Sequence, residues 1–328
     1  MATTTHIIGT GETYTDLSAW ETGVGSSGGE QIAILKEDIN DNVTFSGWPS
    51  AHSDGTPSEI TIKGDLTGVV KRVVTSKSSG SNVLYFADVD ISAVTIEDLT
   101  INGSGQASSK SGVSLANGTV TLTLNRVRIT NTTLHGVLIN ASSATTTTNI
   151  DNCIFDNNDG SGYRDAHYAV SSAATIRNCL FAKNGGNAQN LASSSALTVT
   201  YRNCLSFGNS VDFGDGGENS NVSVLHCVSE DSSATTGHDT VTECIGGQTG
   251  TGSYFRDYTN DDYTLRHDDF TNWGINGDSA NTPAKDFSNR TRVNNDIGPF
   301  EYVQHMVAPA IDQTLTMKMA RGLADHEH

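Results

Sequence analysis

The chain has 328 residues, enough for one large domain with a buried core. With 33 glycines, 5 prolines and 17% charged residues, it is too polar for a helical bundle, yet its apolar residues are too regularly spaced for a disordered chain. The formal net charge of −18, without a basic stripe, repels phosphate backbones and anionic headgroups, so we expect no nucleic-acid and no membrane partner. The ordinary role of such a charge is to maintain solubility.

The beginning of the sequence carries no sign of a secretory leader. Residues 1–11 lack both the basic stretch and the apolar run of a signal peptide, and no long apolar segment follows them. The five cysteines agree with this, because an odd number cannot all pair and none has the C-x-x-C spacing of a metal site. We therefore expect a protein that is not classically secreted.

The first elements in chain order resemble the capped end of a repeat protein. Residues 3–11 predict a strand and a turn, and residues 15–21 predict a short helix with Thr15 as its N-cap. Leu17 and Trp20 would share one face of that helix, which would cover the apolar end of the repeat. Further strands are predicted at 32–35, 43–45, 60–63, 69–74 and 83–86.

The main signal is an internal repeat that begins near residue 95. Five eight-residue segments align, and two shorter ones continue the series: 95–102, 123–130, 149–156, 175–182, 200–207, 224–228 and 241–245. One column of this alignment reads Leu99, Val127, Cys153, Cys179, Cys204, Cys227 and Cys244, with steps of 28, 26, 26, 25, 23 and 17 residues. Such steps lie mostly in the range of one coil of a solenoid.

Apolar residues also recur three positions before and two positions after this column, which indicates a strand of period two followed by a bend. In a stack of parallel coils, equivalent side chains contact each other along the axis. The cysteines are therefore predicted to form a buried ladder of free thiols, with a redox or metal role as the less favoured alternative. The preceding column, often Asn, is predicted to form the bend, bonding to the turn or to the next Asn.

The predicted fold is all-β, a single-stranded right-handed parallel β-helix, which is a solenoid. Its N-terminal strand and capping helix would occupy residues 1–30 and the β-helix residues 31–302. Residues 303–328 would form a short C-terminal extension. In that extension Ile311, Leu315 and Leu323 are spaced for an amphipathic helix around residues 312–324, which would either cap the last coil or bind a partner. Met317, Met319 and Leu323 are the candidate residues for binding a partner.

Three stretches carry a family resemblance: residues 7–21, residues 254–265, and residues 286–302 with the closing sequence Asp-Ile-Gly-Pro-Phe-Glu. Together with the Asn-Cys coils, they resemble right-handed parallel β-helix proteins of the pectate-lyase-like superfamily, especially single-domain versions encoded by tailed bacteriophages. The resemblance covers about residues 3–302. It implies either cleavage or binding of polysaccharide, as in tailspikes and lyases, or a structural place in the virion. Fold alone does not choose between them.

Candidate catalytic groups are few. A glycosidase needs two carboxylates about 5–10 Å apart, and the best set is Asp212, Asp215 and Glu218, near Asp156, Asp159 and Asp165 of earlier coils. Acidic turns rich in glycine are also common without catalysis. A lyase would need Asp residues for Ca²⁺ and a basic residue, but the arginines more readily form outward stacks paired with acids; these are Arg126, Arg128, Arg177 and Arg202.

No metal and no cofactor are predicted. Residues 156–160 resemble a Ca²⁺ loop, but its twelfth position would be His167 instead of Glu, and His326 and His328 belong to a terminus that we expect to fray. The aromatic residues considered for a sugar-binding platform are Trp48, Tyr163, Tyr168, Tyr201 and Trp273, of which Tyr201 fits a core position better.

The favoured hypothesis is a bacteriophage virion protein: a capsid decoration, spike or fibre-like rod for adhesion or particle stabilisation. It would be assembled in the host cytoplasm and would contact other virion proteins, host surface glycan and further copies of itself. The alternatives are a tailspike-like polysaccharide depolymerase, acting as a lyase or glycoside hydrolase, and a non-catalytic carbohydrate-binding module.

Overall fold

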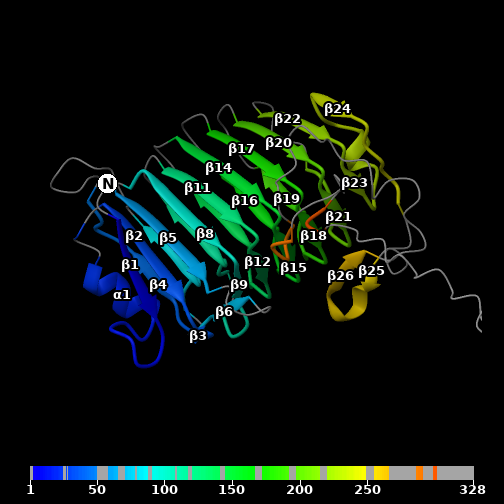
Figure 1. Cartoon of the computed structure of the whole chain (residues 1–328). Coiled ribbons are helices and arrows are strands. Elements are labelled where there is room, and N and C mark those ends of the chain that lie inside the picture. The colour runs from blue at the N-terminus through cyan, green and yellow to red at the C-terminus, as the bar shows by residue number, and fades with distance from the viewer. Residues whose placement is uncertain are drawn as a thin grey trace, which may run out of the picture.

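The chain folds as an all-β parallel solenoid of about seven turns (Figure 1). This computed structural model describes residues 3–24, 27, 29–49, 58–65, 71–77, 80–87, 91–107, 109–116, 120–140, 145–166, 172–191, 197–214, 220–248, 255–265, 286–290 and 298–300. The β-solenoid predicted from the repeat is confirmed. No described helix is long and apolar enough to cross a bilayer.

Each full coil contributes one strand to each of three parallel sheets. The ten-stranded sheet contains, in spatial order, β1 (Thr3–Ile8), β2 (Glu30–Leu35), β5 (Glu59–Gly64), β8 (Ala93–Glu97), β11 (Val120–Asn125), β14 (Thr146–Asp151), β17 (Ser172–Arg177), β20 (Leu197–Arg202), β22 (Ser220–Leu225) and β24 (Thr240–Thr242). The eight-stranded sheet contains β3 (Ile39–Asn40), β6 (Arg72–Thr75), β9 (Leu99–Asn102), β12 (Arg128–Thr130), β15 (Ile154–Asp156), β18 (Leu180–Ala182), β21 (Leu205–Phe207) and β23 (Val228–Ser229). The six-stranded sheet contains β4 (Val43–Phe45), β7 (Leu84–Ala87), β10 (Val113–Ala116), β13 (Val137–Asn140), β16 (Tyr163–Asp165) and β19 (Gln189–Leu191).

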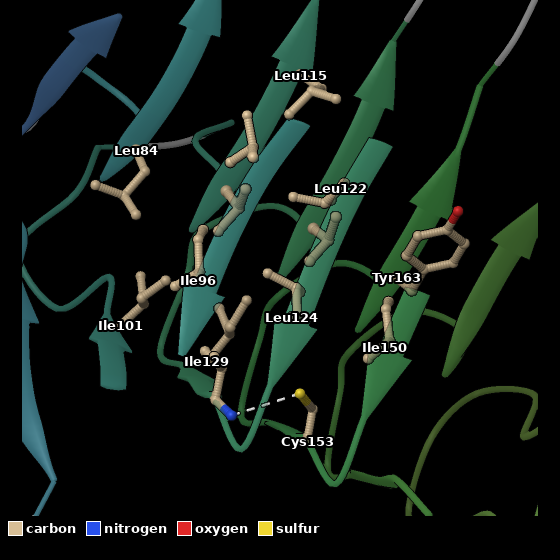
Figure 2. Close-up of a cluster of buried hydrophobic side chains, with 14 of the residues drawn as sticks. Leu84, Ile96, Ile101, Leu115, Leu122, Leu124, Ile129, Ile150, Cys153 and Tyr163 are labelled. Carbon is tan, nitrogen blue, oxygen red and sulfur yellow. Dashed lines mark hydrogen bonds between the residues drawn. The ribbon is translucent and has the colours of Figure 1, made fainter. Parts of the chain in front are cut away.

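The register of the strands stacks like residues on like residues. In the ten-stranded sheet, Leu124 pairs with Ile96 on one side and with Ile150 on the other, and all three side chains are fully buried. In the eight-stranded sheet, the rings of Phe155 and Phe181 stack with centroids 5.0 Å apart. Alternation along each strand sends one set of side chains inward, and neighbouring coils complete the core (Figure 2).

The bend between the ten-stranded and eight-stranded sheets has a backbone cause. The residue before each ladder position has a positive φ, 53° at Asn152, 51° at Asn178 and 54° at Asn203. Asn and Asp tolerate this left-handed conformation better than other residues with side chains, which explains the recurring Asn. Arg126 and His226 adopt it too, with φ of 55° and 53°.

The ladder cysteines do more than fill space. Cys153, Cys179, Cys204 and Cys227 are free and buried, while Cys244, at the end of the column, is half-buried. The sulfur of Cys179 accepts the backbone N–H of Cys153 at 3.4 Å and donates to the carbonyl of Arg177 at 3.2 Å. Each thiol therefore bonds backbone groups at a corner where the strand ladder is interrupted.

A second ladder, which the sequence repeat did not reveal, uses asparagine. Asn158 donates its Nδ2 to Oδ1 of Asn184 at 2.9 Å, and Asn184 donates to Oδ1 of Asn209 at 2.8 Å. Thr132 begins the column by donating its hydroxyl to Asn158 at 2.8 Å. On this turn after the eight-stranded sheet, hydrogen-bonded amides fix the spacing of successive coils.

The N-terminal end is covered by helix α1 (Leu17–Val24), as predicted, but its N-cap differs. Asp16, not Thr15, accepts the backbone N–H of Ala19, at 2.8 Å through Oδ1. A carboxylate is a strong acceptor and also carries the charge that a helix N-terminus favours. Leu17 and Trp20 are fully buried, and Trp20 packs against Phe45 and Trp48 of the first coil.

The C-terminal part folds back onto the outer face of the eight-stranded sheet. An antiparallel hairpin of β25 (Phe255–Asp257) and β26 (Asp262–Leu265), joined by the short 3₁₀ helix η3 (Tyr258–Asn260), packs on that face; a second 3₁₀ helix, η1 (Ser233–Thr235), lies earlier in the chain. Phe255 and Tyr263 join an outward-facing apolar cluster with Ile154, Leu180 and Leu205. This sheet is therefore covered on both sides.

Two short segments further along the chain continue the covering. Gly298 donates its backbone N–H to the carbonyl of Asn203 at 2.7 Å, so close to Leu205 that a Cβ would lie 2.6 Å from Cδ1. With φ at 92°, this position requires glycine. Phe287 and Phe300 contact each other beside it, with ring centroids 5.4 Å apart. The described part of the closing sequence, residues 298–300, thus packs on the outer face of the sheet.

Thiol labelling tests the cysteine ladder. We expect Cys153, Cys179, Cys204 and Cys227 to react slowly with an alkylating reagent in native buffer, because the reagent cannot reach a buried thiol. Cys244 should react quickly, because it is half-buried and the hydrogen bond from Cys227 lowers the pKa of its thiol to about 7. Mass spectrometry after timed quenching measures both rates, with labelling in denaturant as the control. Rapid native labelling of all five would contradict the ladder.

Candidate functional site

Only one residue of the predicted acidic site lies in the described part of the chain. Asp212 follows β21, whereas Asp215 and Glu218 lie outside the described residues. The other acids considered with them have three different surroundings: Asp156 is buried on the outer side of β15, Asp159 is exposed on a turn, and Asp165 is buried inside the solenoid. The structure therefore does not bring Asp156, Asp159 and Asp165 into one group.

Asp212 links two neighbouring coils. Its Oδ1 accepts the hydroxyl of Ser206 at 2.9 Å and Nδ2 of Asn209 at 3.0 Å, and its Oδ2 accepts the backbone N–H groups of Glu230 and Asp231 at 2.6 and 3.1 Å. Burial raises the pKa of Asp212 to about 6, although the four donors favour the charged form. With four donors around it, this carboxylate stabilises the turns.

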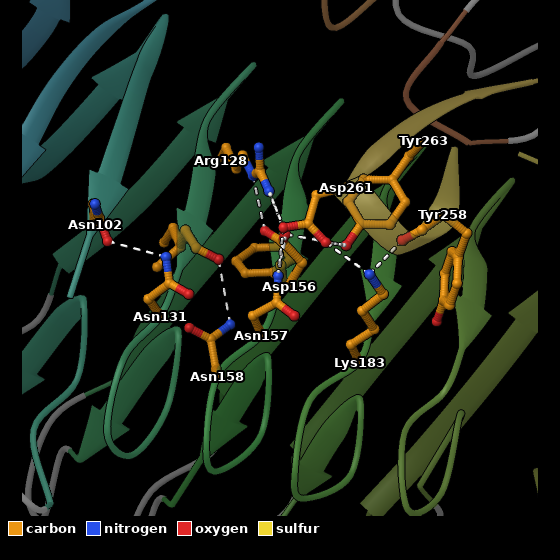
Figure 3. Close-up of polar contacts among 12 residues, drawn as sticks. Asn102, Arg128, Asn131, Asp156, Asn157, Asn158, Lys183, Tyr258, Asp261 and Tyr263 are labelled. Carbon is orange, nitrogen blue, oxygen red and sulfur yellow. Dashed lines mark hydrogen bonds and ion pairs between the residues drawn. The ribbon is translucent and has the colours of Figure 1, made fainter. Parts of the chain in front are cut away.

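The densest group of charged residues lies between the eight-stranded sheet and the hairpin (Figure 3). We name the residues Arg128, Asp156, Lys183, Asp261 and Tyr263 the hairpin cluster. Arg128 and Asp156 come from adjacent strands β12 and β15, Lys183 directly follows β18, and the other two come from the hairpin. The stacking of coils brings the first three to one face, and the hairpin supplies the rest.

Asp156 is the centre of the hairpin cluster. Its carboxylate is fully buried and forms a two-pronged ion pair with Arg128, in which Nε lies 2.9 Å from Oδ1 and Nη2 lies 2.5 Å from Oδ2. Tyr263 donates its hydroxyl to Oδ2 at 3.1 Å, and Asn157 donates its Nδ2 at 2.9 Å. The buried charge is thus paired and hydrogen-bonded, as a stable buried carboxylate requires.

Asp261 holds the turn of the hairpin. Its Oδ1 lies 2.7 Å from Nζ of Lys183, and its Oδ2 accepts Nδ2 of Asn157 at 3.0 Å. Lys183 also donates to the carbonyl of Tyr258 and lies 4.5 Å from the centre of that ring. Figure 3 shows Lys183 reaching from the sheet toward both hairpin residues. The lysine therefore fastens the hairpin through its charge, its donors and a cation–π contact.

The electrostatics of the hairpin cluster favour a structural role. Burial alone would raise the pKa of Asp261, but the hydrogen bond and charge of Lys183 lower it. Burial disfavours the charged form of Arg128, but the hydrogen bonds and charge of Asp156 outweigh this and raise its pKa. Burial also raises the pKa of Tyr263 far above its ordinary value. Two carboxylates are thus held by two cations, whereas acid–base catalysis by two carboxyl groups needs their pKa values pushed apart.

A second group fastens the segment around Phe287. Lys71 donates to the backbone carbonyl of Arg126, lies 3.7 Å from Oδ1 of Asp98, and lies 4.0 Å from the ring centre of Phe287. Burial lowers the pKa of Lys71 to about 8. Arg126 itself binds Asp98 with both contacts at 2.7 Å. Sequence reasoning missed Lys71, because nothing in its neighbours predicts this burial.

The ion-pair interpretation of the arginines agrees with these contacts. Arg126 and Arg128 pair with acids as described above, and Arg177 binds Asp151 with two contacts of 2.6 Å on the ten-stranded sheet. Within the described part of the chain, no three His, Cys, Asp or Glu side chains converge as metal ligands would.

The aromatic platform is wrong for Trp48 and Tyr163, because both are buried, with at most 2% of each residue exposed. Tyr201 is fully buried, which confirms that it fits a core position better. Tyr168 and Trp273 lie outside the described residues, as do Met317, Met319 and Leu323 of the C-terminal extension.

The outer face of the ten-stranded sheet carries an uncharged surface made of residues at equivalent positions of successive coils. Two columns of outward side chains run along it from β8 to β22, and we name them the uncharged face. The central column is Thr95, Thr123, Asn149, Thr175, Thr200 and Ser223. Beside it stand Ala93, Thr121, Thr147, Ala173, Thr198 and Asn221. All twelve are half-buried or exposed.

The regularity of the uncharged face follows from the fold. Successive strands lie about 4.8 Å apart, so the hydroxyl and methyl groups repeat at that spacing. Threonine has a restricted χ1 angle and fits an exposed strand position. The face can thus form repeated neutral hydrogen bonds and apolar contacts, with ion pairs such as Arg177–Asp151 at its border.

A buried histidine lies in the turn that joins β12 to β13. His135 is 4% exposed, its Nδ1 accepts the backbone N–H of Ser161 at 2.9 Å, and its Nε2 lies 3.2 Å from Nη1 of Arg164. Burial first, and then the charge of Arg164, lower the pKa of His135 to about 4. The imidazole is therefore neutral at ordinary pH.

Two comparisons with known proteins found no match. No protein-family model matches the chain, and no curated protein matches it. The resemblance to phage-encoded β-helix proteins therefore rests on the sequence stretches quoted at the outset.

The hairpin cluster can be tested by changing Asp156. Asp156→Asn should lower the stability of the docked hairpin by about 1–3 kcal/mol, because the half-buried Arg128 then loses its two-pronged ion pair and keeps only Asp261, at 3.5 Å, as a counter-charge. Hydrogen exchange should accelerate at residues 255–265 more than in the ten-stranded sheet. Asp159→Asn, which changes an exposed acid on the next turn, is the matched control. Unchanged exchange in the hairpin of Asp156→Asn would refute the fastening role.

The pH dependence of stability tests His135. Its pKa is about 6.5 when unfolded and about 4 when folded, so the unfolded chain binds more protons between these values. Stability that is complete above pH 6.5 should therefore be lost as pH falls toward 4, by up to about 3 kcal/mol from this group. Urea midpoints at pH 7 and pH 5 should differ less in His135→Asn, which retains an acceptor for Ser161. An equal difference in both proteins would contradict the assignment.

Proposed function

We propose that the chain is a structural protein of a bacteriophage particle, a β-helical rod of the pectate-lyase-like kind that serves as decoration, spike or fibre. The sequence resemblance supports the source and the superfamily. The architecture supports the rod, because an extended stack of coils with matched register is stiff along its axis.

The observation that carries the proposal is the continuous ten-stranded sheet with its uncharged face. Its parallel pairing runs from β1 to β24, and the sulfur and asparagine ladders lock neighbouring coils together. Such a surface holds a fixed, repeated pattern of neutral groups without the entropy cost of ordering a loop. This favours adhesion to a long, neutral, repetitive partner, and host surface glycan has that chemistry.

The charged groups of the hairpin cluster support the same reading. They fasten the covering segments to the outer face of the eight-stranded sheet, which the chain itself therefore covers. The uncharged face of the ten-stranded sheet is available for contact with a partner. We infer that attachment to other virion proteins uses an end of the rod, with residues 303–328 as the candidate segment, and that the rod associates with further copies of itself.

The alternative is a depolymerase that uses Asp215 and Glu218 together with Asp212. Its specific prediction is release of reducing ends or unsaturated sugars from host polysaccharide by the purified protein, abolished by Asp215→Ala and Glu218→Ala. Mass spectrometry of purified particles tests the virion assignment directly, since a structural component must be present in them.

Adhesion can be tested with charge placed on the uncharged face. Thr123→Lys combined with Thr175→Lys should weaken binding to host cells or isolated glycan at least about tenfold, because neutral contacts are replaced by bulky, hydrated ammonium groups. Leu138→Lys, on the outer side of β13 in the six-stranded sheet, is the control for a lysine placed on another face and should bind normally. Equal binding by all three proteins would show that this face is not the contact surface.

A further inference from the structure

The interior of the solenoid changes character along its axis. In the coil that contains β10 and β11, the inward side chains are aliphatic, including Val113, Leu115, Leu122 and Leu124, all at most 1% exposed. In the following coils several inward positions become polar. They hold Thr146 and Thr148 of β14, Tyr163 and Asp165 of β16, Ser172 of β17 and Gln189 of β19, all at most 6% exposed.

Part of this polar interior is satisfied by its own side chains. Tyr163 donates its hydroxyl to Asp165 at 3.0 Å, and the hydroxyl of Ser172 lies 3.4 Å from the same oxygen. Figure 2 shows Tyr163 extending its hydroxyl within the core, in the row where earlier coils place aliphatic side chains such as Leu84. In this column of stacked side chains, the polar hydroxyl of Tyr163 therefore takes the place of an aliphatic group.

Two further groups have no such partner. Gln189 pairs in register with Tyr163 and is 0% exposed, yet neither its Oε1 nor its Nε2 meets a hydrogen-bond partner among the described residues. The hydroxyl of Tyr201, at the end of the next strand of the chain, is equally buried and equally unpartnered within them. Burial, and less strongly the charges of Cys204 and Asp165, raise the pKa of Tyr201. A buried amide and a buried hydroxyl without partners are strongly unfavourable, and native proteins rarely contain them.

The chemistry of these groups defines what would satisfy them. Gln189 offers two donors and one acceptor, and the hydroxyl of Tyr201 offers both. An occupant must therefore both donate and accept hydrogen bonds. Water does both, and it commonly binds buried polar groups through two to four hydrogen bonds.

We propose that the solenoid encloses an internal hydration site, in which ordered water molecules join Gln189 and Tyr201 to the Tyr163–Asp165 pair. The site lies within the wall of coils, between the six-stranded and ten-stranded sheets. It is independent of the proposed adhesive function. The hydrogen-bonded network fixes the relative position of three successive coils, since polar groups must meet at defined distances whereas aliphatic stacks tolerate sliding.

Magnetic relaxation dispersion of water nuclei tests the site directly, because it detects water molecules that stay bound for microseconds or longer. The native protein should show a long-lived water signal that decreases in the double variant Gln189→Leu with Tyr201→Phe. Ile150→Val, which removes a methyl group from the core side of β14, two strands away from β20 in the ten-stranded sheet, is the control and should leave the signal unchanged. A signal that is equal in all three proteins would overturn the proposal.

The urea midpoint of Tyr201→Phe gives a second readout, because it should shift in opposite directions with and without bound water. With bound water, Tyr201→Phe removes a satisfied hydroxyl and should lower the urea midpoint; without water, it removes an unsatisfied group and should raise the midpoint. If the double variant does not fold, a high-resolution crystal structure of the native protein decides. Density within hydrogen-bond distance of Gln189 and Tyr201 would support the site, and its absence there would refute it.

Discussion

Parallel stacking of the coils at one strand spacing is the constraint on which the rest of this structure depends. Because every coil lies about 4.8 Å from the next, a side chain that points inward in one coil must meet its equivalent above and below. Like residues therefore recur in columns, as Ile96, Leu124 and Ile150 do in the ten-stranded sheet. The corners are repeated in the same way, with a left-handed residue before each cysteine.

The corners show how side chains bind the backbone N–H and C=O groups of a repeat protein where the strand ladder is interrupted. At one corner the sulfur of each ladder cysteine accepts an N–H from the preceding coil, as Cys179 does from Cys153. At another corner an asparagine amide bonds its equivalent, as Asn158 does with Asn184. These ladders fix the position of each coil on the next. The surface groups therefore also repeat in a fixed pattern, as the proposed rod requires.

The outer faces depend on what the chain places on them. The eight-stranded sheet is covered by the C-terminal hairpin. The burial of Asp156 there is offset by its ion pair with Arg128 and by hydrogen bonds from Tyr263 and Asn157. The ten-stranded sheet presents Thr123 and its equivalents to solvent. The same architecture thus produces one sealed face and one neutral, regular face, and this difference underlies the proposed adhesive role.

The sequence by itself determined the solenoid, its coil length and the inward columns, because stacking imposes a period that an alignment of the chain with itself reveals. It also predicted the capping helix and the burial of Leu17 and Trp20, but it assigned the N-cap to Thr15 where the carboxylate of Asp16 makes the bond. Only the tertiary structure decided the hairpin cluster, because Asn157 and Asp261 meet across 104 residues without any repeat to align them. It likewise decided that Tyr163 points inward, since alternation places a residue on one face or the other only once the strand's register is known.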